Sequence, residues 1–520
     1  MTAARLALAR YLTAASRVAS LKGFHYACLQ TLPTSWLVRA LAAFGVTYDL
    51  RLRGAHAKAA SKRRGAKGAG VRELCPGCDP RYWYIHGKPY DLSAYVDKHP
   101  GGRAFLLLGK GRDVTELVES VHAMTAENWR KVLLKYEVQG AHEAPRLGGG
   151  FDWELSGDNN ASGDVFYAEL KRRVRARFAA RRTGGDKTGT LAAPWSYWAW
   201  QIPSLAFSLL CTYRWIATAS ALYAMAAGFM WGVTGFGLMH TASHGGLSHN
   251  QTLQHVAHMM WCNLFGVFNP MWLQHHVWGH HSYTGVVKAD PDLTHGFPVF
   301  RKHREQSYWP IYRHQAWAAF VLLSVFPNQL MGQALIYMRG FATGKLFGMQ
   351  VVPAVDGWRC MAGLIGFGAI SIGCLAVLPM VLHGPLQALP SLLAYAFTIG
   401  GIYFGLVFPN HDMEHTPERR RDWGEQQVLN SGNFGLPAWF SQLVGCMNYQ
   451  IEHHLFPGVH PAYYPEISQE VRKLCAERGL IYNYQPTWFA ALQSYRRNLQ
   501  TLSVPSGLES NAHKYVNKAK

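Results

Sequence analysis

The chain has 520 residues, of which 49% are hydrophobic and 16% charged, and its formal net charge is +20. This composition excludes a disordered chain, which requires low hydrophobicity and high charge. The 18 Trp, 25 Tyr and 25 Phe are typical of the aromatic belts that proteins place at membrane surfaces. The 25 His exceed ordinary usage and are a first indication of metal chemistry.

Residues 1–72 carry a large part of the positive charge. They contain 13 Lys and Arg against a single acid, Asp49, and so supply +12. Their Ala-, Arg- and Leu-rich composition favours either an organelle transit peptide or a basic tail on a membrane surface, and both remain open. We expect no nucleic-acid partner, because the remaining charge lies beside apolar segments, where basic residues mark cytoplasmic loops and attract anionic lipid.

Residues 73–142 are polar and predict a small soluble domain, followed by a glycine-rich linker over 143–190. His99 opens a His-Pro-Gly-Gly run, and His122 follows 23 residues later, after several apolar residues. Proline and glycine permit a tight turn that a flat cofactor can approach. Two His from opposite sides would fill both axial positions of a haem iron, which then transfers electrons. The segment resembles the cytochrome b5 domain, which implies haem b bound by His99 and His122.

Four uncharged apolar stretches reach the roughly 20 residues that a membrane-spanning helix needs. They are residues 191–213, 215–239, 360–382 and 384–409. Only Arg214 separates the first pair and only His383 the second, which predicts two helical hairpins. A fifth stretch, 316–338, contains Pro327 and is predicted to be interfacial or buried.

The two hairpins also predict a topology. Each hairpin returns the chain to the side from which it started. The linker, residues 240–359 and the tail after His411 are therefore predicted to share one side, and their Lys and Arg content makes it the cytoplasmic side.

Three clusters rich in histidine lie just outside the hairpins. His240 and His244 are four residues apart, which places both imidazoles on one face of a helix. The second cluster holds His276, His280 and His281, the third holds Gln450, His453 and His454, and His411 directly follows the last apolar stretch. One metal takes at most about six ligands, so eight His imply two metals. Iron fits a chain with an electron-transferring haem better than zinc, which is redox-inert.

These clusters carry a specific resemblance. Together with the Gln of the third cluster, the tail HHLFPGVHPAYYPEISQEVRKLC and an Asp-Pro-Asp run at 290–292, they resemble front-end acyl desaturases over about residues 80–500. The resemblance implies two irons on His240, His244, His276, His280, His281, His453 and His454, all of which are counted with Gln450 as catalytic. It also implies an additional ligand at His411, or at His415 as the second candidate, while Thr241 departs from the family's usual Asp.

The resulting prediction is a multi-domain protein. A basic extension (1–72), a small α+β haem domain (73–142) and a linker (143–190) precede an all-α integral membrane desaturase domain (191–500) and a tail (501–520). The desaturase domain is expected to have about four transmembrane helices and a cytoplasmic metal-binding cap. The expected cofactors are two non-haem irons and haem b.

The resemblance also implies the reaction and its partners. We expect a double bond to be introduced between an existing double bond and the carboxyl end of a fatty acyl lipid or acyl-CoA. The reaction would use O2 and electrons from a cytochrome b5 reductase or another donor. The spacing of His276, His280 and His281 resembles that of Δ4 and Δ5 enzymes more than that of Δ6 enzymes, which implies a Δ4 or Δ5 position ahead of Δ6. We expect a multi-pass protein in contact with membrane lipids, in the endoplasmic reticulum or, as the alternative, in a plastid membrane.

Three other functions stay open at this stage. A sphingolipid long-chain-base desaturase and a lipid hydroxylase would share the haem fusion or the metal site, and their products would identify them. A haem-bearing membrane carrier without enzymatic activity would explain residues 73–142 but not the histidine clusters, and it would contain haem iron alone.

Overall fold

The computed structural model describes residues 78–125, 128–141, 165–179, 191–265, 269–287, 289–295, 300–325, 345–346, 349–350, 366–414 and 422–509. The predicted extension 1–72, the linker apart from 165–179, the tail beyond 509 and His415 lie outside these ranges. The described part is mostly helical and contains three two-stranded sheets.

The amino-terminal module combines a β-hairpin with short helices. Strands β1 (Trp83–Ile85) and β2 (Lys88–Tyr90) pair antiparallel, with Tyr84 opposite Pro89. His86 and Gly87 both have positive φ, the conformation of a two-residue hairpin turn. The module continues through η2 (Val96–Lys98), α4 (Arg103–Leu108), α5 (Thr115–Val121), α6 (Asn128–Leu133) and η3 (Leu134–Tyr136). Its α+β composition agrees with the prediction.

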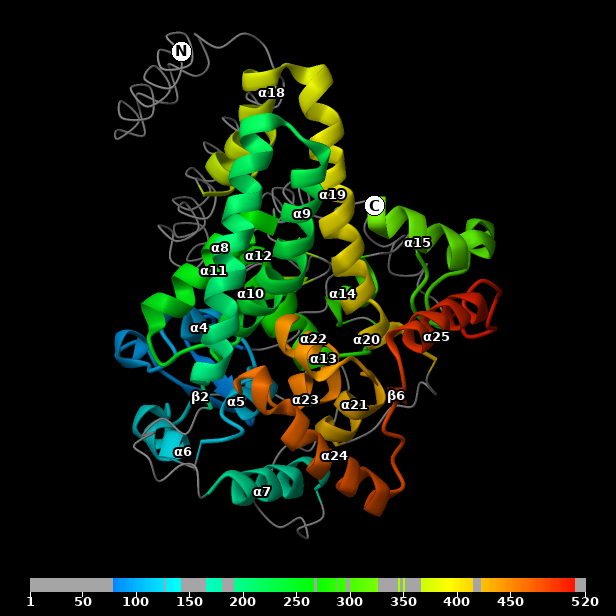
Figure 1. Ribbon diagram of the computed structural model, residues 1–520. Helices are drawn as coiled ribbons and strands as arrows, with labels where there is room; N and C mark the ends of the chain where they lie inside the picture. Colours follow the sequence, from blue (N-terminus) through cyan, green and yellow to red (C-terminus); the bar gives the residue numbers. More distant parts are fainter. Residues whose placement is uncertain are drawn as a thin grey trace, which may run out of the picture.

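Two helical hairpins lie side by side at one end of the molecule (Figure 1). The first contains α8 (Trp195–Thr218), α9 (Ala221–Met230), the π-helix η5 (Trp231–Gly235) and α10 (Phe236–Ser243). The second contains the π-helix η8 (Phe367–Val377), α18 (Leu378–His383), α19 (Pro385–Val407) and α20 (Pro409–Asp412). Both turns lie at the same end, away from the amino-terminal module, whose predicted cofactor gives it the name haem module below (Figure 1).

The first hairpin turns later than the sequence predicts. Arg214 does not break α8, because its guanidinium lies 5.3 Å over the ring of Tyr223 and so finds a partner within the hairpin. The chain turns instead at Ala219, which has a left-handed conformation with φ of 49°. The second turn lies at Gly384, with φ of 80°, directly after the predicted His383.

Two helices of the described part are long and apolar enough to cross a membrane, Ala221–Ser243 and Pro385–Asp412. Apolar side chains are nevertheless exposed on all four long helical segments, with Phe207 on α8, Phe229 on α9, Leu382 on α18 and Leu393 on α19. Monomeric soluble proteins rarely expose contiguous apolar surface of this kind. The count of four spans remains a prediction.

Most of the remaining described helices lie towards the other end of the hairpins, away from the turns (Figure 1). In chain order they are α7 (Phe166–Phe178), α11 (Gln251–Phe265), α12 (Asn269–Trp272), the π-helix η6 (Leu273–His280), α13 (His281–Tyr283), α14 (Pro291–His295), η7 (Pro310–His314), α15 (Gln315–Val325), α21 (Trp423–Leu429), α22 (Ala438–Leu443), α23 (Gln450–Leu455), η9 (Pro461–Tyr463), α24 (Tyr464–Arg478) and α25 (Trp488–Thr501). Strands β3 (Lys345–Leu346) and β4 (Met349–Gln350) pair antiparallel, whereas β5 (Asn433–Phe434) and β6 (Tyr484–Gln485) pair parallel.

Two of these helices fall in segments that the sequence left without a definite structure. Helix α7 lies in the predicted linker, and Phe166, Leu170, Val174 and Phe178 are buried along one face at intervals of four residues. This face packs against α21 and α24. Helix α15 covers the described part of the predicted interfacial stretch, with Trp317 exposed, and residues 326–338 of that stretch lie outside the described ranges.

Candidate metal centre

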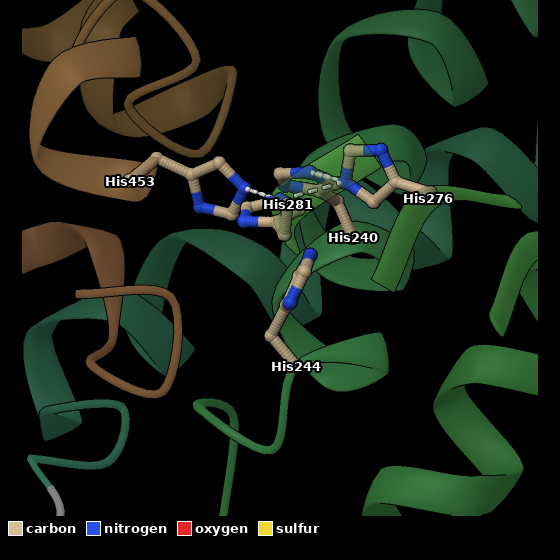
Figure 2. A group of neighbouring side chains, drawn as sticks. All are labelled: His240, His244, His276, His281 and His453. Atoms are coloured by element: carbon tan, nitrogen blue, oxygen red, sulfur yellow. Dashed lines mark hydrogen bonds between the residues drawn. The ribbon is translucent and has the colours of Figure 1, made fainter. Parts of the chain in front are cut away.

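Eight histidines from distant parts of the chain meet in two adjacent groups at the ends of α10 and α19. The first, called here the five-histidine group, consists of His240, His244, His276, His281 and His453 (Figure 2). The second, the three-histidine group, consists of His280, His411 and His454. In each group the candidate ligand nitrogens all lie within 4.8 Å of one another. These eight are the histidines that the sequence pointed to, with His411 as the additional one.

The imidazoles of the five-histidine group converge through their Nε2 atoms. Nε2 of His276 lies 2.8 Å from that of His240 and 3.3 Å from that of His281. His281 is in turn 3.0 Å from His453 (Figure 2). His244 packs against this set, with its ring centroid 4.3 Å from that of His281. Lone pairs converging in this way are suited to share a cation.

The three-histidine group is oriented from behind by hydrogen bonds. Nε2 of His411 lies 3.2 Å from that of His280 and 3.1 Å from that of His454. Each Nδ1 faces outward: that of His280 contacts Asp290 Oδ1 at 3.0 Å, and that of His411 donates to the carbonyl of Asn430 at 2.9 Å. A proton held on Nδ1 leaves Nε2 unprotonated, which is how protein environments prepare His for a metal.

His454 is held in the same way by two side chains. Its Nδ1 lies 2.9 Å from Gln427 Oε1 and 3.1 Å from Thr284 Oγ1. Behind the other group, the Nδ1 of His453 lies 3.2 Å from the hydroxyl of Tyr464. Support through Nδ1 therefore covers all three members of the three-histidine group and His453 of the five-histidine group.

A π-helix distributes the histidines of the second cluster between the two groups. Its turns are wider than those of an α-helix, so residues five apart share a face. His276 and His281 are five apart and meet in the five-histidine group, whereas His280 belongs to the other. Helix α23 divides its adjacent His453 and His454 in the same way. Adjacent histidines of one cluster therefore belong to different groups.

The electrostatics of the site favour neutral imidazoles. Burial lowers the pKa of His276, His281 and His453 well below the usual 6.5. His280 differs: burial acts to lower its pKa, but the carboxylates of Asp292 and Asp290 outweigh this and raise it to about 9. These carboxylates therefore favour the imidazolium form of His280, with one proton on the Nδ1 that faces Asp290 and a second on Nε2, which a metal bound there would replace.

The residues fit a transition-metal site on physical grounds. Both ring nitrogens of His244 are buried and have no hydrogen-bond partner among the described residues. A buried polar group without a partner costs about 1–3 kcal/mol, and a bound metal would remove this cost. Neutral imidazoles in this number suit iron, copper, nickel or zinc.

The haem module presents a second pair of prepared imidazoles. The rings of His99 and His122 face each other with centroids 6.2 Å apart. Their Nδ1 atoms lie 3.2 Å from the carbonyl of Gly102 and 2.8 Å from that of Val118. Burial lowers the pKa of both, that of His99 to about 4. A Cβ at Gly101 would lie 2.8 Å from His99 Cε1, so only glycine fits beside this ring. The pair fits axial ligation of a haem.

The haem module packs directly on the helix that carries the second cluster. The guanidinium of Arg112 lies 4.0 Å over the ring of Trp278, and its Nη2 donates to Gln274 Oε1 at 3.3 Å. Trp278 and Gln274 belong to η6, which also carries His276 and His280. Helix α5, whose carboxyl end is capped by His122, packs on α13, which begins at His281.

Sequence reasoning did not assign roles to the residues behind the imidazoles. Asp290 and Asp292 were noticed only as part of a motif, and His275 proves to contact Asp292 rather than either histidine group. Asn410, which precedes His411, donates to Gln450 Oε1 at 3.0 Å. The polar character of the Asn-His-Asp run at 410–412, directly after an apolar stretch, was the available signal.

Comparisons with known proteins agree with this geometry. The family model described as "Fatty acid desaturase" matches residues 213–486, and that described as "Cytochrome b5-like Heme/Steroid binding domain" matches residues 71–141. The chain is 29% identical to the "Acyl-lipid (7-3)-desaturase, chloroplastic" of Chlamydomonas reinhardtii, over 77% of this chain and 76% of the relative. It is 26% identical to the "Probable Delta(5) fatty acid desaturase C" of Dictyostelium discoideum, over 79% of this chain and 89% of the relative. It is 25% identical to the "Acyl-lipid (8-3)-desaturase" of Mortierella alpina, over 81% of this chain and 93% of the relative.

Proposed function

The chain belongs to the fatty acid desaturase family and carries an amino-terminal cytochrome b5 domain, and from this premise we propose that it is a front-end acyl-lipid desaturase. It would introduce a double bond between an existing double bond and the carboxyl end of a polyunsaturated acyl chain. The names of the relatives, which are acyl-lipid and fatty acid desaturases, favour a fatty acyl substrate over a sphingolipid long-chain base.

One observation carries this proposal. Histidines separated by up to 214 positions, from His240 to His454, converge in two adjacent groups at the ends of apolar helices. A structural role for buried, neutral imidazoles would require hydrogen-bond partners, and both nitrogens of His244 lack them among the described residues. Two metals beside a lipid-facing helical bundle account for both features.

The proposed irons would be held by the two groups separately. The five-histidine group would hold one iron and the three-histidine group the other. When bound, the two irons supply the reduction of O2 to water that is coupled to removal of two hydrogens from adjacent acyl carbons. Hydrogen bonds to Asp290, Asn430 and Gln427 would keep the imidazoles in place while the charge at the site changes.

Aromatic side chains line the membrane side of the five-histidine group. Phe236 stacks on His240, with ring centroids 5.7 Å apart, and Trp272 stacks on His276 at 4.3 Å. Tyr403 of α19 contacts Phe236 at 5.0 Å. These rings would keep water from the site and would hold an acyl chain that approaches from the lipid between α10 and α19.

The proposal includes an internal relay of electrons from the haem to the metal centre. The support is the packing of the haem module on η6, because Arg112 contacts Trp278 between the positions of His276 and His280. An external reductase would reduce the haem on His99 and His122, and the module would pass the electrons one at a time. Fixed packing would make this transfer independent of diffusion.

The position of the double bond and the membrane are further proposals. The spacing of His276, His280 and His281 supports a Δ4 or Δ5 position ahead of Δ6, and one relative is named a Delta(5) desaturase. We place the protein in the endoplasmic reticulum membrane, with a plastid membrane as the alternative that residues 1–72 leave open.

Expression in yeast with candidate polyunsaturated acids tests the function. We expect a new acid with one additional double bond on the carboxyl side of an existing one, identified by double-bond mapping. An oxygenated product would indicate a hydroxylase instead. Purified protein that contains haem iron but no further iron would contradict the proposal.

A further inference from the structure

Two buried side-chain amides, those of Asn410 and Gln450, form a chain of hydrogen bonds between a backbone carbonyl and the three-histidine group. Gln450 begins α23, and its Nε2 lies 2.9 Å from Nε2 of His411. Its Oε1 accepts a hydrogen bond of 3.0 Å from Nδ2 of Asn410. The two amides are 3% and 0% exposed, so protein groups rather than solvent determine which atom of each amide faces the histidine.

A backbone carbonyl determines the orientation of Asn410. Its Nδ2 also donates to the carbonyl oxygen of Met447 at 3.0 Å. A carbonyl oxygen can only accept hydrogen bonds, so the Asn410 atom that faces Met447 has to be the amide nitrogen. This same nitrogen faces Gln450, and Gln450 therefore has to present its oxygen to Asn410.

The orientation of Gln450 follows from that of Asn410. With its oxygen engaged, Gln450 turns its NH2 group towards His411. His411 donates through Nδ1 to the carbonyl of Asn430 at 2.9 Å, so its Nε2 carries a lone pair and can accept from Gln450. Turning the Gln450 amide round would bring two donors together at Asn410 and leave both without an acceptor there, which is unfavourable for buried polar groups.

We propose that Gln450 acts as a hydrogen-bond donor at the metal centre and is not an oxygen ligand, and that Asn410 is the positioning residue that holds it in this orientation. An amide NH2 group offers two donors and no lone pair for a metal. Its partner in the metal-loaded protein would be an oxygen-containing ligand such as water. This inference rests on the proposed function and adds to it the role of the one non-histidine residue in the three clusters.

The contrast with Gln427 supports the assignment. Gln427 contacts the outward Nδ1 of His454 through its oxygen, at 2.9 Å, and so accepts a hydrogen bond from behind the imidazole. Gln450 contacts the inward Nε2 of His411 through its nitrogen. The amide of Gln427 thus offers an acceptor at an outward Nδ1, whereas the amide of Gln450 offers a donor at an inward Nε2, where the metal would bind.

Two substitutions at Gln450 separate a donor from a ligand in the purified, full-length protein with haem and iron. Gln450→Glu keeps the shape and the oxygen but removes the amide donor. We expect iron per haem at the wild-type level or above, and at least roughly 10-fold less conversion of a fed polyunsaturated acid. Wild-type conversion by this variant, or loss of iron from it, would overturn the donor role.

Gln450→Leu provides a readout that does not depend on activity. If Gln450 is no ligand, the ligand-field spectrum of the ferrous protein should show the same coordination number as the wild type. A lower coordination number would overturn the proposal. Should the wild-type protein desaturate no fed acid, the proposed function would fail, and this spectrum would still decide between donor and ligand.

Asn410→Asp tests the positioning role. A carboxylate would repel the carbonyl of Met447 and accept from the NH2 group of Gln450, which turns that amide round. We expect retained iron and conversion lowered by roughly 10-fold or more, whereas unchanged conversion would overturn the role of Asn410. Gln500→Glu, exposed on α25, is the matched control and should behave as the wild type.

Discussion

At the scale of single residues, the hydrogen bonds behind the imidazoles prepare the site. His280 contacts a carboxylate through Nδ1, His411 a carbonyl and His454 an amide oxygen, so that each turns Nε2 inward. The haem module repeats this arrangement at His99 and His122 with backbone carbonyls. The two candidate cofactor sites therefore share one arrangement, in which the outward Nδ1 of each of these imidazoles contacts a hydrogen-bond acceptor.

Removal of one axial imidazole should separate the two sites. His99→Ala should abolish the haem absorbance and reduce desaturation to a small fraction of the wild type, because the relay loses its carrier. The iron of the histidine groups should remain, since neither group includes His99. The measurement is product formation in a host without free cytochrome b5, together with metal analysis of the membranes. Full conversion by this variant would refute the internal relay.

The carboxylate behind His280 should contribute to metal affinity. Both oxygens of Asp290 accept: Oδ1 from Nδ1 of His280 at 3.0 Å, and Oδ2 from the amide of Gly285 at 2.8 Å. An asparagine would place its NH2 group against one of these donors. Asp290→Asn should therefore weaken iron binding by roughly 10- to 100-fold.

Iron per haem measures this effect, because the haem module serves as an internal standard. Asp97→Asn is a suitable control, since the Asp97 side chain is 77% exposed and pairs with Arg103 inside the haem module. Equal iron content in Asp290→Asn and the wild type would show that the contact does not support metal binding.

At the scale of elements, π-helices occur at three points of the described chain: η5, η6 and η8. Well under 1% of residues in globular proteins adopt this conformation, and it occurs frequently at functional sites. The wider turn of η6 brings its His276 together with His281, the first residue of α13, whereas His280 belongs to the other group. Helix η5 directly precedes α10, which carries His240.

The contact between Arg112, which lies between α4 and α5, and η6 should determine how the haem module sits on the metal centre. Arg112→Leu removes the stack on Trp278, worth roughly 2 kcal/mol when desolvated, and leaves Gln274 Oε1 without this donor. We expect that the haem content and the rate at which a reductase reduces the haem are both unchanged. Reoxidation of the haem in the presence of substrate and O2 should be slower than in the wild type.

Rapid-mixing absorbance spectroscopy follows this reoxidation directly. Arg81→Leu is the control, because the Arg81 side chain is 72% exposed and pairs with Asp79 on the surface of the haem module. If Arg112→Leu reoxidises at the wild-type rate, the contact does not determine the electron transfer.

At the scale of the whole molecule, the two hairpins point their turns in one direction and their open ends towards the site (Figure 1). Glycine permits close approach between them: a Cβ at Gly228 would lie 2.8 Å from the carbonyl of Tyr395. The open ends bring His240 to the five-histidine group and His411 to the adjacent three-histidine group. The haem module, α7 and α24 lie past the open ends of the hairpins, on the side away from the turns (Figure 1).

This arrangement predicts where tags become accessible. Tags after residue 150, at Glu305 and at the carboxyl end should react on the cytoplasmic side of sealed membranes. Tags in the turns at Ser220 and Gly384 should react on the opposite side, because each turn lies at the far end of its hairpin. Labelling with a membrane-impermeant reagent tests this, and a tag at Glu305 on the side of the turns would rule out the two-hairpin topology.

Local patterns in the chain were enough to predict that His99 and His122 lie opposite each other, which histidines gather in clusters, and that the apolar stretches form two hairpins. The reason is that each depends on short-range properties: the His-Pro-Gly-Gly turn at His99, the spacing of four between His240 and His244, and the length of uncharged stretches. The first hairpin turn was placed wrongly at Arg214, because a cation over an aromatic ring is a contact between helices and leaves no local signal.

The division of eight histidines into groups of five and three required the tertiary structure. Neighbours such as His453 and His454 go to different groups, and their partners His281 and His411 lie 172 and 43 positions away. The orientation of Gln450 likewise depends on Asn410, 40 positions earlier. Spacing along a helix predicts which side a residue faces, but only packing decides which atoms of distant segments meet there, because hydrogen bonds act over about 3 Å.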